Sequence, residues 1–80
     1  MLYKVGPAQY STVRLDKINI GETFVINNGI EEVYVMHQTG FVELFTGRSH
    51  VVTYGETACI LVEPTSFTDG TIVFTRIQGV

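Results

Sequence analysis

The chain has little charge and few basic residues. Only 16% of its 80 residues are Asp, Glu, Lys or Arg, and its five basic residues leave a formal net charge of −3. This balance is unfavourable for binding a phosphate backbone, so we expect no general affinity for nucleic acid. At 45% apolar, the chain is nonetheless too hydrophobic to be disordered.

Cysteine and long hydrophobic runs are also scarce. The single cysteine, Cys59, excludes an internal disulfide and is typical of the reducing cytoplasm. It lies in the apolar run TACILVEP, which predicts a small buried side chain. No stretch reaches the ~18 apolar residues of a membrane span, and the first residues lack a signal-peptide pattern. We therefore expect one cytoplasmic domain over residues 1–80, without a membrane partner.

Motifs for catalysis or metal binding are absent from the sequence. It contains no HExxH, CxxC or Walker-type loop. His37 and His50 are predicted on opposite faces of the strands that carry them, so they cannot share a metal within one chain. Glu31 and Glu32 are adjacent and would face opposite ways in a strand. We therefore predict a non-enzymatic protein that needs no metal or cofactor.

What the chain does have is a succession of short β-branched and aromatic segments between turn residues. This pattern predicts an all-β protein, either a small SH3-like barrel or a meander of about six to eight short antiparallel strands. The expected strands are residues 2–5, 11–15, 22–27, 31–38, 41–46, 49–54, 57–63 and 71–78. A single turn is expected within LDKINIGE and a long loop at PTSFTDGT.

Three two-residue turns set the expected registers: Asn28-Gly29, Thr39-Gly40 and Gly47-Arg48. They pair Phe24 with Val33, Met36 with Glu43, and Phe41 with Tyr54. Because opposed residues share a face, the registers sort the side chains onto two faces. The first is an aliphatic core face with Phe24, Ile26, Val33, Val35, Val42, Leu44 and Val51. The second carries Val25, Tyr34, Met36, Phe41, Phe45, Val52 and Tyr54, with Glu32, Gln38, Glu43 and His50.

The second face is too apolar for the outside of a small barrel. Several adjacent aromatic side chains would exceed the apolar patch that a soluble monomer tolerates. Three coverings remain open: the last two strands folded over as a second sheet, another copy of the chain in a homo-oligomer, or a planar ligand or partner protein.

The turn TGRS carries the clearest candidate site. Arg48 projects from its tip, and His50 follows on the second face. Arginine binds phosphate in a bidentate manner, and aromatic rings stack on bases, so a nucleotide-type anion would fit there. A second cation would come from Arg14, Lys17 or Arg76. The alternative is an ordinary polar hairpin end whose cations are balanced by carboxylates. The predicted ligand-binding residues are Arg14, Tyr34, Phe45, Arg48, His50 and Tyr54.

A short pattern runs through residues 15–48: Leu15, Ile18, Ile20-Gly21-Glu22-Thr23-Phe24, Val33-Tyr34-Val35 and Thr46-Gly47. In it the chain resembles small bacteriophage-encoded proteins of SH3-like β-barrel type. The resemblance implies an accessory protein in the host-cell cytoplasm that acts by binding. One version is a counter-defence sponge that sequesters a nucleotide-type signal at a homo-oligomer interface. The alternative is an inhibitor of a host protein or a small virion component that uses the aromatic face. GTIVFTRIQGV lies outside the pattern and is expected to serve assembly.

Overall fold

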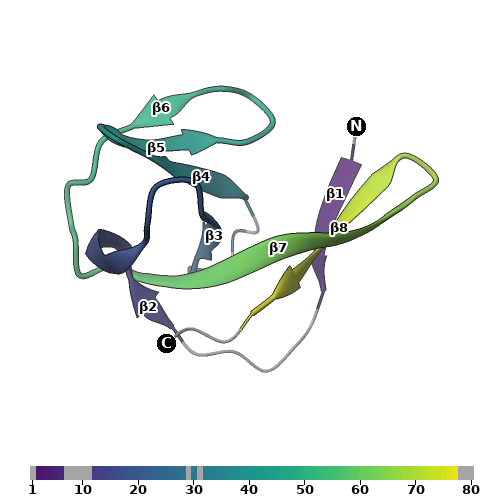
Figure 1. The fold of residues 1–80 in the computed structure, drawn as a ribbon, viewed down its shortest axis with the longest axis horizontal. Coiled ribbons are helices and arrows are strands. Elements are labelled where there is room, and N and C mark those ends of the chain that lie inside the picture. Colours follow the sequence, from purple (N-terminus) through teal and green to yellow (C-terminus); the bar gives the residue numbers. More distant parts are fainter. Residues whose placement is uncertain (1, 7–11, 29, 31, 78–80) are drawn as a thin grey trace.

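The computed structural model describes residues 2–6, 12–28, 30 and 32–77, and it is nearly all β (Figure 1). The strands are β1 Leu2–Gly6, β2 Val13–Arg14, β3 Thr23–Ile26, β4 Tyr34–His37, β5 Gly40–Glu43, β6 Ser49–His50, β7 Ala58–Thr68 and β8 Thr71–Arg76. A 3-10 turn, η1, spans Leu15–Lys17, inside the stretch for which the sequence predicts a single turn. The predicted all-β class is therefore confirmed.

The strands form one sheet in the order β1-β8-β7-β3-β4-β5-β6, and β2 also pairs with β7. Strands β3 to β6 form an antiparallel meander. The pair β1–β8 is parallel, which differs from the purely antiparallel arrangement that the sequence predicts. Both ends of the path are edges, because β1 and β6 each have a single neighbour among the strands that the structure describes.

The long loop expected at PTSFTDGT is wrong. Strand β7 continues to Thr68, which lies opposite Thr71. Asp69 and Gly70 form a two-residue turn with φ values of +52° and +77°, as a type I′ hairpin requires and as Asp-Gly favours. Pro64 lies at a register shift, where it interrupts the ladder without ending the strand.

The register of the first predicted hairpin is wrong by one residue. Phe24 lies opposite Tyr34 instead of Val33. Since side chains alternate along a strand, this slip moves Phe24 from the predicted aliphatic face to the aromatic face. Gly29, in the turn that set the prediction, lies outside the described residues.

The other two predicted registers are also shifted, but without a change of face. Met36 lies opposite Phe41 instead of Glu43, a shift of two residues. Phe41 lies opposite His50 instead of Tyr54, a shift of four. Even shifts preserve the alternation, so Met36, Phe41 and His50 share one face as predicted.

Two buried clusters make up the core. The first contains Val25, Val33, Ile60, Val62 and Phe74, with Phe45 and Ile72 packed against it. The second contains Leu15, Ile18, Phe24, Met36, Phe41 and Cys59, with Tyr34 among its partly buried neighbours. The aromatic face is thus largely covered within the chain, by the η1 region and by β7, which belongs to the same sheet. Cys59 is buried, as predicted, whereas Leu44 and Val51, both expected in the core, are exposed.

Gly40 allows β6 to approach β5 closely, so its replacement tests the observed register. A Cβ at this position would collide with the carbonyl oxygen of His50, and φ is +155°. We expect Gly40→Ala to lower the free energy of unfolding by about 1–3 kcal/mol through this clash alone. Urea denaturation measures the loss. Gly47→Ala is the matched control, because φ is +77° there but nothing lies within 4 Å of the added Cβ. Equal losses in the two variants would contradict the close approach.

Candidate functional site

Strands β4, β5 and β6 bring five side chains together, which we call the Glu43 cluster: Tyr34, Phe41, Glu43, Arg48 and His50. The His50 ring stacks on Phe41, with centroids 5.1 Å apart and an interplanar angle of 16°. Tyr34 meets Phe41 and His50 edge-on, at 5.1 and 5.8 Å. Three of the six predicted site residues, Tyr34, Arg48 and His50, therefore do lie together.

One carboxylate faces both Arg48 and His50. Glu43 Oε2 lies 2.8 Å from His50 Nε2 and 3.9 Å from Arg48 Nε. Thr46 Oγ1 donates a hydrogen bond of 2.9 Å to Glu43 Oε1. The hydrogen bond to His50, followed by that from Thr46, holds the pKa of Glu43 below its ordinary value. The cationic tip is thus balanced by an acid, which supports the polar-hairpin alternative more than a free anion site.

Phe41 also lines an open apolar hollow of about 280 Å³, which we call the Tyr54 hollow. Its walls are Leu15, Ile26, Phe41, Val51, Thr53, Tyr54 and Thr57. The rim is tied in place because the Leu15 N–H donates to the Thr57 carbonyl, and the Thr57 hydroxyl donates to the Tyr54 carbonyl. None of these lining side chains is charged, yet Val51 is 70% exposed and Tyr54 68%. Tyr54, a predicted site residue, therefore adjoins the Glu43 cluster through Phe41.

The other two predicted site residues lie elsewhere. Arg14 donates hydrogen bonds of 3.0 and 2.8 Å to the two carboxylate oxygens of Asp16, and this contact lowers the pKa of Asp16. Phe45 packs edge-on against Phe74 at 6.2 Å, beside the first core cluster. Neither residue contributes to a stacking or phosphate site with Arg48.

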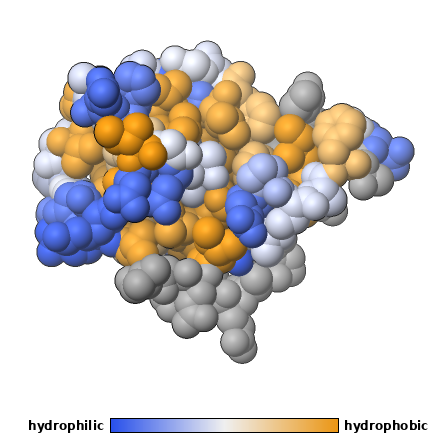
Figure 2. Space-filling model, in the orientation of Figure 1, coloured by the Kyte–Doolittle hydropathy of each residue, from blue (hydrophilic) through white to orange (hydrophobic). Residues whose placement is uncertain are grey.

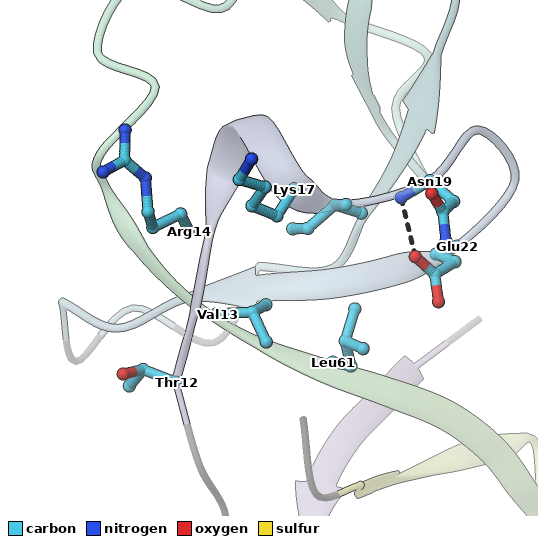
Figure 3. Close-up of a pocket in the computed structure, with 8 residues that line it drawn as sticks. Thr12, Val13, Arg14, Lys17, Asn19, Glu22 and Leu61 are labelled. Carbon is cyan, nitrogen blue, oxygen red and sulfur yellow. Dashed lines mark hydrogen bonds between the residues drawn. The ribbon is translucent and has the colours of Figure 1, made fainter. Parts of the chain in front are cut away.

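A larger pocket of about 380 Å³ lies between β2, the η1 region and β7 (Figure 3). Its lining residues are Thr12, Val13, Arg14, Lys17, Ile18, Asn19, Glu22 and Leu61. Figure 3 shows the Arg14 side chain on the opposite side of β2 from Val13. The Asn19 backbone N–H donates a hydrogen bond of 2.7 Å to Glu22 Oε1. None of these described lining residues is aromatic, so they offer no stacking platform for a nucleotide base.

The residues that the sequence analysis did not assign to a site are those that connect its parts. Phe41 joins the Glu43 cluster to the Tyr54 hollow, and Glu43 faces both His50 and Arg48. Leu15 and Thr57 complete the hollow through a backbone contact between distant segments. Only the strand register brings these residues together, so no local motif could have indicated them.

Comparisons with known proteins identify no relative. A scan against protein-family models, a search of curated proteins and a search of solved structures each find no match. The resemblance of residues 15–48 to phage proteins therefore stays a prediction. Within the described part of the chain, no group of His, Cys, Asp and Glu side chains is placed to hold a metal ion. Burial raises the pKa of the Cys59 thiol to about 11, so the reactive thiolate is scarce at neutral pH. No described helix is long and apolar enough to cross a membrane.

The lowered pKa of Glu43 predicts how stability depends on pH. Its pairing stabilises the fold above the ordinary value of 4.5, and this contribution is lost as the pH falls through the lower folded value. We expect Glu43→Gln to be less stable than the wild type near neutral pH and to lose less on acidification. Urea midpoints at about pH 7 and about pH 3.5 measure both effects. Glu63→Gln, at an exposed position of β7, is the control, and a Glu43→Gln curve parallel to the wild type would contradict the pairing.

Proposed function

We propose that the protein is a non-enzymatic interaction domain whose Tyr54 hollow takes an aromatic side chain from a protein partner. The exposure of its rim carries the proposal: Val51 is 70% exposed and Tyr54 68%. Covering apolar surface recovers about 25 cal/mol per Å² removed from water. Exposed apolar side chains around a concave site are typical of a surface that a partner covers.

An aromatic side chain fits the hollow in size and chemistry. A dry apolar cavity of about 150 Å³ is enough to bind benzene, and the hollow measures about 280 Å³. Phe41 and Tyr54 supply ring contacts, which add roughly 0.5–1.5 kcal/mol per aromatic pair beyond area burial. The uncharged lining favours an uncharged side chain, because a buried charge without a partner is costly.

Capture of a nucleotide-type anion at a homo-oligomer interface is a second candidate. Arg48 supports it, since its side chain is 75% exposed and faces the same carboxylate, Glu43, as His50, whose ring stacks on Phe41. A phosphate would have to compete with Glu43 for Arg48 and His50, so this function is less favoured. We propose further that the chain is a phage accessory protein. Under the first candidate function its partner would be a host protein, and under the second its ligand would be a nucleotide signal.

Titration calorimetry with adenosine monophosphate tests the second candidate. If the protein captures nucleotides at this tip, Arg48→Ala abolishes binding, because it removes the exposed guanidinium. Arg14→Ala is the control and retains binding, since the Arg14 guanidinium is held by Asp16. Absence of binding to the wild type, or equal loss in the two variants, would remove Arg48 from the site.

An NMR titration with N-acetylphenylalaninamide tests the hollow. It is carried out on the wild type and on Phe67→Asp. Phe67 is a 63% exposed aromatic side chain, and in a concentrated sample Phe67 of another molecule would compete with the probe for the hollow. We expect chemical-shift changes centred on Val51, Thr53 and Tyr54, and an affinity about tenfold weaker in Tyr54→Ala.

The matched probe is N-acetylalaninamide, which keeps the amide groups but lacks the ring. Shifts of equal size with both probes, or shifts centred away from the hollow in both proteins, would contradict the proposed function.

A further inference from the structure

The end of the β7–β8 hairpin forms an arm that extends beyond the rest of the sheet (Figure 1). Strand β7 pairs with β3 only over residues 59–62. From residue 63 to its end, its described partner is β8 alone, and the side chains of residues 63–67 are exposed. Strand β1 pairs along β8 on the other side, so the arm is three strands wide. A large apolar side chain exposed on such an arm is available for contact with a partner.

One face of the arm continues the first core cluster outward. Phe74 is 2% exposed, and Ile72, two residues nearer the hairpin turn on β8, is partly buried against the same cluster. Phe67 lies opposite Ile72, so it shares that face, but it is 63% exposed. Figure 2 shows apolar surface reaching along the arm toward its hydrophilic tip. Phe67 is thus the outer end of an apolar row that the described residues of its own chain leave uncovered.

The arm and the Tyr54 hollow lie at opposite ends of the molecule. Residues 51–57 are at one end of the longest axis and the hairpin turn is at the other (Figure 1). The molecule extends 36 Å along that axis. An exposed aromatic side chain and an open apolar hollow therefore occur in one chain but cannot meet within it.

We propose that the aromatic side chain received by the Tyr54 hollow is Phe67 of a second copy of this chain, so that copies associate head to tail. This inference rests on the proposed function and names its partner. The contacting residues are compatible with a second copy as the occupant. Thr65, Ser66, Phe67 and the hollow lining are all uncharged, so the contact itself buries no charge. The acidic residues Asp69 of the arm and Glu56 beside the hollow lie around the contact.

The geometry of the contact determines the kind of assembly. An arm in a hollow is a heterologous contact, and such contacts form a ring when the rotation closes. One aromatic side chain buries on the order of 150–250 Å², far less than the roughly 1,000 Å² of a stable interface. A closed ring gives each subunit two contacts and makes the last one intramolecular, which raises the overall affinity.

Native mass spectrometry and light scattering of the full chain test the assembly. We expect a closed oligomer for the wild type, and monomers for Phe67→Asp and Tyr54→Asp. Ile20→Asp is the matched control, because Ile20 is 64% exposed but belongs to neither the arm nor the hollow, and it keeps the oligomer. Circular dichroism confirms that each variant is folded. The proposal is overturned if the wild type is monomeric at the highest protein concentration measured, or if Phe67→Asp forms the same oligomer as the wild type.

A mixing experiment separates this contact from arm-to-arm pairing. Labelled Phe67→Asp has an intact hollow, and unlabelled Tyr54→Asp has an intact arm. Adding unlabelled Tyr54→Asp should shift the NMR signals of Val51 and Thr53 in labelled Phe67→Asp. Adding unlabelled Phe67→Asp should leave these signals unchanged. No shift in the mixture overturns the head-to-tail contact. If N-acetylphenylalaninamide still binds the hollow in that case, the proposed function survives and only its partner is wrong. If that probe also fails, both proposals fall.

Discussion

Strand β7 is the constraint on which the rest of the structure depends. It pairs with β2, β3 and β8, and its alternating side chains enter both buried clusters, Cys59 in one and Ile60 and Val62 in the other. A strand that is buried on both faces must be apolar on both, which explains the unbroken run ACILV. Because its first half belongs to the body and its second half to the arm, β7 also sets the direction in which the arm leaves the body.

The same sheet determines what the cationic turn can do. Pairing of β5 with β4 and β6 places Glu43 beside both His50 and Arg48. Glu43 lies at hydrogen-bonding distance from His50, at 2.8 Å, and 3.9 Å from the Arg48 guanidinium. An incoming anion would therefore be repelled by this carboxylate and would have to compete with it. The surface with unsatisfied chemistry is instead apolar, at the rim of the Tyr54 hollow and at Phe67. The structure therefore favours a binding surface made of apolar side chains over one made of Arg48 and His50.

The composition, with 45% apolar and 16% charged residues, already indicated that a monomer would expose apolar surface. It did not indicate where on the molecule that surface lies. Most of the aromatic face expected to need an external cover is covered by Leu15, Ile18 and Cys59 of the same chain. Exposed apolar side chains lie instead at two ends of the molecule: Val51 and Tyr54 in a segment expected to be a strand, and Phe67 in a segment expected to be a loop. Because the two exposed apolar patches lie at different ends of the molecule, the proposed contact between copies is head to tail and does not use a single self-complementary face.

The sequence by itself determined the local features: the all-β class, the approximate positions of the strands, the turn in the η1 region and the burial of Cys59. These follow from side-chain shape, turn chemistry and hydrophobicity over a few residues. The sequence placed the end of β7 too early, and it extended β6, which ends at His50, to residue 54. The Asp69-Gly70 hairpin was readable in the same way, but Pro64 concealed it. Register was decided only by tertiary structure, because a one-residue slip changes little locally and yet moves Phe24 to another face. The contacts of Phe45 with Phe74 and of Leu15 with Thr57 depend on the tertiary structure, since each joins segments that only the folded sheet brings together.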